Sequence, residues 1–239
     1  MRHNEFGQPI GDLVEAWTTR PRPPRTPMEG RYCRVEPLDL DRHAAHLHAA
    51  NTTADDDRRW TYLSVEGFAD VEGYRQWLRQ MLAGDDSLFH AIVDGVSNQA
   101  VGVAAYLRID PANGAIEVGH INYSSRLQQT CAATEAMFLM MRRAFDELGY
   151  RRYEWKCDSL NEPSRRAAAR LGFTFEGIFR QAVVYKNRNR DTAWFSILHS
   201  EWPALRSAYE QWLAPGNFDE QGRQRRALAA LIATARAGR

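Results

Sequence analysis

A short turn of small and polar residues opens directly into an apolar helical segment. It reads Gln128-Gln129-Thr130-Cys131-Ala132-Ala133. The first amides of a helix have no intrahelical acceptor and the helix dipole adds partial positive charge, so an anionic phosphate is stabilised at such a place. Small side chains let the backbone approach a ligand closely. The turn therefore predicts a cradle for a phosphate-bearing cofactor.

Two ionisable side chains precede this turn on one predicted strand, 115–123. Glu117 and His120 could each accept a proton as a general base, although a glutamate paired with an arginine at the surface would explain Glu117 equally well. Side chains three positions apart on a regular strand face opposite sides. We therefore expect one of the two to be wrong as a direct base unless a bulge intervenes.

A cysteine and a histidine group invite other chemistry. Cys131 at a helix N-terminus would have its thiolate favoured, so a nucleophilic or redox role must be considered. A cysteine hydrolase would also need a histidine and an Asp or Asn in a recognisable pattern, and none accompanies Cys131. This favours the interpretation that Cys131 is a small residue tolerated in a tight turn. His43, His46 and His48 lack a carboxylate or cysteine at ligand spacing, so we expect no metal site.

The elements that position these residues follow from periodicity and turn residues. Met137, Met141 and Phe145 recur at helical spacing until Gly149, which predicts a long buried helix. Strands over 88–93, 100–109 and 115–123 form an antiparallel meander. The other predicted elements are strands over 30–38, 152–157, 174–184 and 192–198, and helices from Asp39 or Asp41 to Asn51 and over 69–82, 162–171, 202–212 and 221–237.

Three regions are predicted along the chain. Residues 1–29 contain five prolines and form an extended leader. Its apolar side chains indicate that it docks on the domain formed by residues 30–200; these are Phe6, Ile10, Leu13 and Trp17. Residues 201–239 form a helical extension whose last helix, with Arg223, Arg225, Arg226 and Arg236, is amphipathic.

Composition limits the classes of function. The 239 residues are 44% hydrophobic and carry a net charge of +1, which is typical of a globular protein and demands neither nucleic acid nor membrane as a partner. Three scattered cysteines indicate no disulfide framework, and neither a signal peptide nor a membrane-spanning segment is visible. We expect a cytoplasmic protein, for which a homodimer stays open because the sequence does not fix the oligomeric state.

The turn and helix resemble motif A of the GCN5-related N-acetyltransferases (GNATs), Q/R-x-x-G-x-G/A. Gln128 stands at its first position and Ala133 at its last, with Cys131 where the family usually has glycine. Downstream segments resemble the branch that includes the ribosomal-protein-alanine N-acetyltransferases; they are 133–136, 145–150, 161–164, 170–173 and 176–180. The resemblance implies an α/β fold with a mixed, mostly antiparallel central sheet flanked by helices. It also implies direct transfer of an acetyl group from acetyl-CoA to a primary amine, on a protein N-terminus or a small molecule, in a ternary complex.

The resemblance also implies roles for individual residues. Glu117 is the first choice for the base, His120 is its rival, and Ser164 would donate a proton to the leaving thiolate. Residues expected at the cofactor are Ile121, Asn122, Tyr123, Gln128, Gln129, Thr130, Cys131, Ala132, Ala133, Asn161, Ser164, Arg165 and Arg166. Residues expected at the acceptor are Trp60, Tyr62, Trp155 and Tyr185. Asn161 is explained equally well as a helix N-cap.

Two other classes of function remain open. A non-catalytic CoA or acyl-CoA sensor could use the same cradle, since Cys131 replaces a glycine and the base is uncertain. An interaction protein could use the arginine-bearing C-terminal helix as its working surface.

Overall fold

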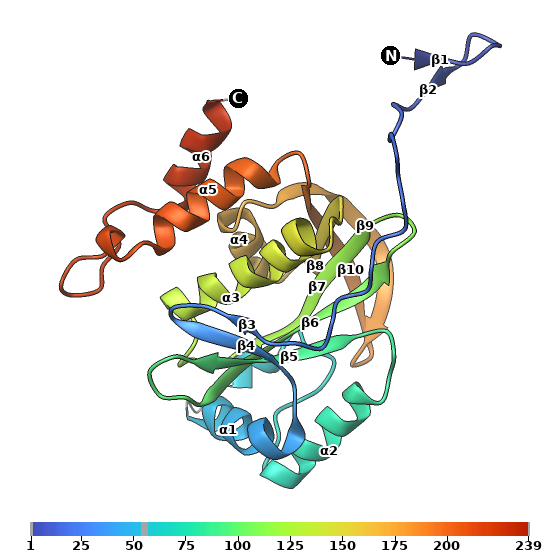
Figure 1. Ribbon diagram of the computed structural model, residues 1–239. Coiled ribbons are helices and arrows are strands. Elements are labelled where there is room, and N and C mark those ends of the chain that lie inside the picture. The colour runs from blue at the N-terminus through green and yellow to red at the C-terminus, as the bar shows by residue number, and fades with distance from the viewer. Residues whose placement is uncertain (1, 54–56, 239) are drawn as a thin grey trace.

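A computed structural model describes residues 2–53 and 57–238. Its centre is an eight-stranded sheet in the order β3-β4-β5-β6-β7-β8-β10-β9 (Figure 1). All neighbouring strands are antiparallel except β7 (Ala115–Tyr123) and β8 (Arg152–Asp158), which run parallel. The predicted mixed, mostly antiparallel sheet is confirmed.

The first half of the sheet is a meander with two helices on one face. Its strands are β3 (Met28–Glu29), β4 (Cys33–Pro37), β5 (Leu88–Asp94), β6 (Ala100–Asp110) and β7. Helices α1 (Leu40–Thr52) and α2 (Val71–Leu82) cover this face (Figure 1). Asp39, one of the two caps predicted for α1, accepts from the Arg42 amide, and Asp70 caps α2 by accepting from the Gly73 amide. The short helix η1 (Asp57–Trp60) lies between them.

The opposite face packs on α3 (Cys131–Arg142), which crosses from β7 to β8. This helix continues as one π-helical turn, Arg143–Glu147, before Gly149 at a φ of 69° ends it. Tyr106 on β6 donates to the Met140 carbonyl at 2.7 Å. The predicted buried helix is therefore present, with a different last turn.

The second half of the chain completes the sheet and the same helical layer. It comprises α4 (Glu162–Arg170), β9 (Thr174–Tyr185), β10 (Arg188–Leu198), α5 (Trp202–Leu213), the short η3 (Pro215–Asn217) and α6 (Leu228–Ala237). The last helix begins at Leu228, so Arg223, Arg225 and Arg226 lie in the loop before it. The helix predicted over 221–237 is therefore confirmed over 228–237, with Leu228, Leu231 and Ile232 buried, and its predicted start was wrong. Of the four arginines assigned to its surface, only Arg236 lies on the helix.

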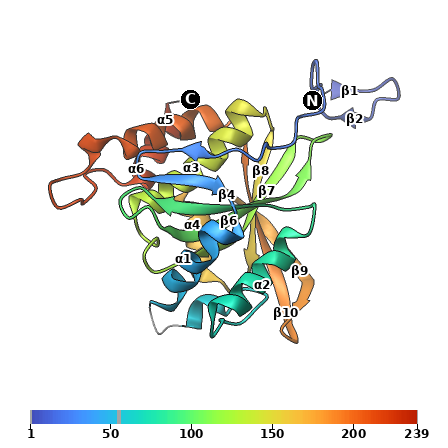
Figure 2. The ribbon, with the colours of Figure 1, turned by 60° about the horizontal axis from the view of Figure 1, so that its bottom comes forward.

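Only part of the N-terminal leader contacts the sheet and its helices. The Trp17 indole donates to the Ala112 carbonyl at 2.8 Å, and buried Arg143 donates to the carbonyls of Thr26 and Pro27. Residues 2–14 project away and include the strands β1 (Arg2–His3) and β2 (Pro9–Ile10) (Figure 2). The docking expected of Phe6, Ile10 and Leu13 does not occur, since they are 78%, 45% and 65% exposed.

Candidate active site

The parallel strands β7 and β8 part halfway along their length. Only four residue pairs join them, from Ala115 with Arg152 to Val118 with Trp155. Beyond these pairs β7 continues beside β6, and β8 continues beside β10. Because α3 follows the carboxyl end of β7 and α4 follows that of β8, both helix N-termini lie at the end of the sheet where the strands part.

The N-terminal turn of α3 presents backbone amides. Thr130 is the N-cap: its hydroxyl accepts from the Ala133 amide at 3.1 Å and donates to the Leu127 carbonyl at 2.7 Å. Among the described residues, no acceptor takes the amides of Gln129 and Ala132. These donors and the helix dipole fit an anionic phosphate.

Two other side chains of this turn differ from expectation. The Gln128 amide donates to the Tyr123 carbonyl at 2.8 Å, so it braces the turn. Burial and then the Glu135 charge raise the pKa of Cys131 above its usual range, against the lowering expected at a helix N-terminus. A thiol held protonated is a poor nucleophile, so the structure disfavours the nucleophilic role for Cys131.

The N-terminus of α4 combines a cap with a serine hydroxyl. Asn161 accepts from the Ser164 amide at 3.1 Å, as its capping interpretation predicts. The Ser164 oxygen accepts from the Trp155 indole at 3.0 Å, and its hydroxyl faces Cys157: burial raises the pKa of Cys157, and the hydrogen bond with Ser164 opposes this rise. Trp155 is only 4% exposed and packs against Phe173, so the structure places it in the core and corrects its assignment to the acceptor pocket.

The arginines of α4 are arranged differently from the prediction. Arg165 donates to the Ser159 carbonyl at 3.3 Å, and Arg166 pairs with Glu162 at 3.4 Å. Arg170 instead reaches α3, where it donates to the Thr134 hydroxyl at 3.2 Å. The cation that α4 places beside the start of α3 is therefore Arg170, and neither Arg165 nor Arg166 has a contact there.

A bulge in β7 brings both candidate bases to one face of the sheet. His120 has a φ of 48°, and His120 and Ile121 together stand opposite the single residue Ala104. The His120 ring packs on Phe89 at 4.9 Å between centroids, in the cluster beneath α1 and α2. Glu117 shares this face, because its neighbours in β7 pack beneath α3. The bulge therefore removes the reason to expect that only one of Glu117 and His120 can act as a direct base.

Both carboxylate oxygens of Glu117 are engaged. Arg108 lies 2.8 Å from Oε1 and Lys156 lies 2.8 Å from Oε2, while the carboxylate itself is 3% exposed. The Lys156 ammonium also lies 2.8 Å from Glu154 and 3.7 Å above the Trp194 ring. Burial raises the pKa of Glu117, and the Lys156 and Arg108 charges oppose this rise. Protonating Glu117 would require one cation to leave.

His120, in contrast to Glu117, is not held by neighbouring charged side chains in the part of the chain that the structure describes. Burial lowers the pKa of His120 and the Arg108 charge lowers it further, so the imidazole is neutral at physiological pH. No hydrogen bond to its ring nitrogens is formed within the described residues. His120 is thus the base candidate that is free to accept a proton.

Known proteins share this architecture. The family model for the acetyltransferase (GNAT) domain matches residues 34–174, more than half of the chain. The chain belongs to the GNAT acetyltransferases. It is similar to the crystal structure of a GCN5-related N-acetyltransferase from Brucella melitensis, with 50% identity, 92% of this chain and 100% of that chain covered, and a TM-score of 0.90.

Two more distant relatives agree with this family. A GNAT-family crystal structure from Chromobacterium violaceum is 42% identical, covers 82% of this chain and 98% of its own, and has a TM-score of 0.76. An uncharacterized N-acetyltransferase of Bacillus licheniformis, p20, is 28% identical over 145 residues, which are 59% of this chain and 80% of that protein.

Residues expected on the acceptor side of this GNAT domain lie where the segments 60–62, 158–160 and 185–186 contact one another. Tyr62 donates to the Leu160 carbonyl at 2.9 Å, and Tyr185 donates to Asp158 at 2.8 Å. Burial and then Asp158 raise the pKa of Tyr185 to about 12. Trp60 is 3% exposed, and its carbonyl rather than its ring joins the group by accepting from Lys186 at 2.8 Å. Tyr62 and Tyr185 are brought together, while the Trp60 ring belongs to the core.

Several residues of the site were missed from the sequence. Lys156, Arg108 and Asp158 carry its charge network. One signal was available for Lys156, because the chain has only two lysines, Lys156 and Lys186. Both contact this region of the GNAT domain.

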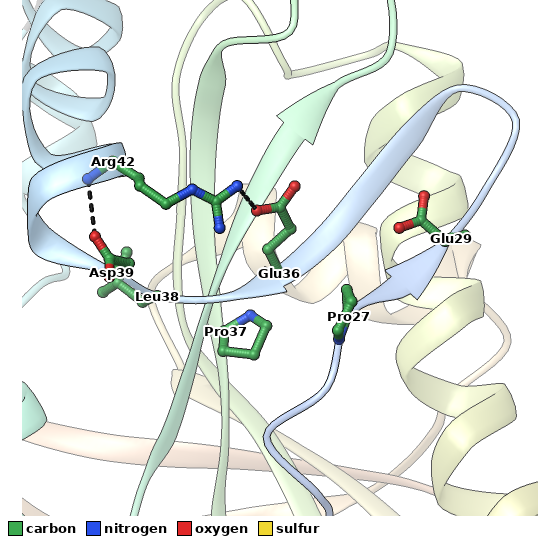
Figure 3. A pocket seen from close by; sticks show the side chains of 7 residues that line it. All are labelled: Pro27, Glu29, Glu36, Pro37, Leu38, Asp39 and Arg42. Atoms are coloured by element: carbon green, nitrogen blue, oxygen red, sulfur yellow. Dashed lines mark hydrogen bonds and ion pairs between the residues drawn. The ribbon is translucent and has the colours of Figure 1, made fainter.

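A pocket outside this site lies between β3, β4 and the start of α1 (Figure 3). It is lined by Pro27, Glu29, Glu36, Pro37, Leu38, Asp39 and Arg42. Glu36 pairs with Arg34 and Arg42, and Asp39 caps α1, so two of its three carboxylates already have partners. Across residues 2–53 and 57–238 there is no cluster of metal-binding side chains and no helix long and apolar enough to cross a membrane.

Proposed function

We propose that this GNAT chain transfers the acetyl group of acetyl-CoA directly to a primary amine while both substrates are bound. The observation that carries the proposal is the parting of β7 and β8 between two capped helix N-termini, with Glu117 and His120 on the adjoining face. Whether the amine belongs to a protein N-terminus, as in the ribosomal-protein branch, or to a small molecule stays open.

The α3 turn is the proposed pyrophosphate site. The amides of Gln129 and Ala132 would donate to phosphate oxygens, and Arg170 adds a cation beside them. A structure with the same fold, the microcin C7 self-immunity acetyltransferase, contains acetyl-CoA and AMP. At 20% identity and a TM-score of 0.61 it supports the fold that holds such a ligand.

The residues of the chain would divide the proton transfers. Acetyl-CoA supplies an activated thioester. As the amine nitrogen bonds to the thioester carbon, His120 accepts the proton that the nitrogen loses. Ser164 passes its proton to the thiolate as the carbon–sulfur bond breaks, and it takes up through solvent the proton that the His120 imidazolium releases, so that CoA leaves as the thiol and both side chains end as they began. Glu117, held by Arg108 and Lys156, would place negative charge near the ammonium form of the acceptor and the imidazolium.

Calorimetry with acetyl-CoA tests the cofactor site first. We expect micromolar binding by the wild type and its loss in Ala132→Asp, because the carboxylate would repel the phosphates. Ala227→Asp is the matched control, since Ala227 is the exposed N-cap of α6, away from the site. Absent binding by the wild type would refute the proposal.

The proposed base is tested by the dependence of kcat/KM on pH. His120→Gln removes the proton acceptor, and we expect a loss of about 100-fold or more with the acid limb of the profile abolished. Glu117→Gln should lower activity and keep that limb. If Glu117→Gln abolishes the limb and His120→Gln keeps it, the roles are reversed.

A non-catalytic CoA sensor is the second candidate, favoured by the two ion pairs that occupy Glu117 and by Cys131 in the usual glycine position. Release of free CoA from acetyl-CoA that depends on an added amine would exclude the sensor. Tight acetyl-CoA binding without such release across a broad amine panel would favour it.

A further inference from the structure

Three alternating residues of β10 face the candidate active site. Trp194 lies beneath the Lys156 ammonium, which contacts Glu117. Ala193, Phe195 and Ile197 point into the core beneath α3, so the alternation of a strand turns Arg190, Thr192 and Trp194 to the opposite face.

Each of these residues has a buried polar atom without a hydrogen-bond partner in the described part of the chain. The atoms are Arg190 Nε, Thr192 Oγ1 and Trp194 Nε1. Thr192 is 5% exposed as a whole. Arg190 also forms no ion pair with any described residue, although Arg190 is half-buried. Three unpartnered groups on one strand face require an explanation, because a buried donor without an acceptor costs about 1–3 kcal/mol.

Nearby carboxylates do not supply the missing acceptor. Asp158 accepts from the Tyr185 hydroxyl at 2.8 Å and from the Leu160 amide at 2.9 Å. Asp191 accepts from the Gln181 amide at 2.8 Å and from the Asn189 side chain at 3.0 Å. The Arg190 guanidinium lies near Tyr185, because its charge opposes the burial that raises the pKa of Tyr185 to about 12.

The chemistry of the three side chains defines which ligand group could accept their hydrogen bonds. The guanidinium and the indole N–H only donate, and the threonine hydroxyl donates as readily as it accepts. A guanidinium with two neighbouring neutral donors matches the oxygens of a carboxylate or phosphate. A cationic ligand group would leave these donors unpaired, and a neutral oxygen would accept from them without balancing the guanidinium charge.

We propose that Arg190, Thr192 and Trp194 bind an oxyanion of the acceptor, so that the acceptor is an amine that also carries a carboxylate or phosphate group. This inference rests on the proposed acetyl transfer. The three atoms are covered in the unliganded protein, so the proposal requires the half-buried Arg190 side chain to rotate as the oxyanion enters. That rotation breaks no hydrogen bond or ion pair of the described residues.

Nuclear magnetic resonance of the indole N–H groups tests the subsite without any turnover. The full chain, labelled with nitrogen-15, is titrated with β-alanine, 2-aminoethyl phosphate and ethanolamine, and Trp194→Phe identifies the Trp194 signal. We expect that signal to shift with one or both anionic amines and not with ethanolamine. The response to the first two probes distinguishes a carboxylate from a phosphate.

Variants then assign the contacts. Arg190→Gln and Thr192→Val should each weaken the titration, by roughly ten- to hundredfold for the arginine, because a charge-assisted contact is lost. Arg180→Gln is the matched control on the exposed strand β9 and should change nothing. An unshifted Trp194 signal with every anionic amine, an equal shift with ethanolamine, or an Arg190→Gln protein that binds like the wild type would overturn the inference.

Turnover separates this inference from the function it rests on. If the protein acetylates ethanolamine as efficiently as the two anionic amines, the oxyanion subsite is refuted and the acetyltransferase activity stands. If the protein does not bind acetyl-CoA, the proposed function fails, and the Trp194 titration still decides whether the oxyanion site exists.

Discussion

Glu135 on α3 stabilises the turn between β3 and β4 through hydrogen bonds. Its carboxylate is 5% exposed and accepts three backbone amides, from Arg31 at 2.8 Å, Tyr32 at 2.6 Å and Cys33 at 2.9 Å. Glu135→Gln keeps the size of the side chain but replaces one acceptor oxygen with a donor NH2 group. At least one backbone amide then faces another donor and loses its acceptor.

The magnitude follows from these three contacts. A hydrogen bond to a charged group contributes about 1.5–3 kcal/mol, and a buried donor left unpaired costs a similar amount. The three contacts are not additive, because they share one carboxylate. We therefore expect Glu135→Gln to lower the free energy of unfolding by about 3 kcal/mol, a large share of the stability of a typical domain.

Urea unfolding followed by circular dichroism measures this change. The midpoint should fall while the dependence on urea concentration stays constant, since the surface exposed on unfolding is the same. Glu210→Gln is the control: it removes an exposed pair with Arg206 and should cost less than about 0.5 kcal/mol. A loss below about 1 kcal/mol for Glu135→Gln, at constant urea dependence, would refute the reasoning.

Three further predictions concern other parts of the chain. Cys131→Ala should keep the affinity for acetyl-CoA and Cys131→Arg should abolish it, as measured by calorimetry; a dead alanine variant with normal affinity would restore a chemical role for the thiol. Burial and then Arg143 lower the pKa of His90 from 6.5 to about 4, so the unfolded chain takes up a proton that the folded protein does not. The free energy of unfolding should therefore fall by about 3 kcal/mol as the pH falls from about 7 to about 4, and His90→Leu should flatten this part of the pH dependence; an unchanged slope would contradict it. Asp39→Ala removes the cap of α1 and should cost about 1 kcal/mol in thermal unfolding, while a neutral effect would show that the cap is dispensable.

Local patterns in the sequence were sufficient for most of the fold. The strand 115–123 was predicted correctly, and the cap of α1 was narrowed to Asp39 or Asp41, because alternation and capping are set by neighbouring residues. The start of α6 was missed because polar residues after 221 continue the helical pattern of 228–237, yet the chain there turns through Asn217, whose side chain bonds Trp212 and Arg226. Contacts between distant residues carry no local signal.

The candidate site was harder to predict for the same reason. The bulge at His120 depends on how β7 pairs with β6, which the sequence of β7 does not show. The alternation of a regular strand therefore placed Glu117 and His120 on opposite faces. Trp155 was assigned to the pocket by its aromatic type, whereas the alternation of β8 turns it into the core beside Ser164. Roles that depend on one residue and its immediate neighbours, such as the Asn161 cap, were within reach of the sequence.

The single parallel pairing has a consequence for the order of folding. Strands β5, β6 and β7 follow one another through short turns and pair in that order, whereas β7 and β8 meet only after the whole of α3 has crossed between them. Closing such a long connection costs more chain entropy than closing a hairpin, so this contact forms late. The place where the strands part, beside the proposed cofactor site, therefore forms only when the two halves of the sheet have joined. A ligand bound there would bind only the fully folded chain, so its binding would shift the population toward the folded state.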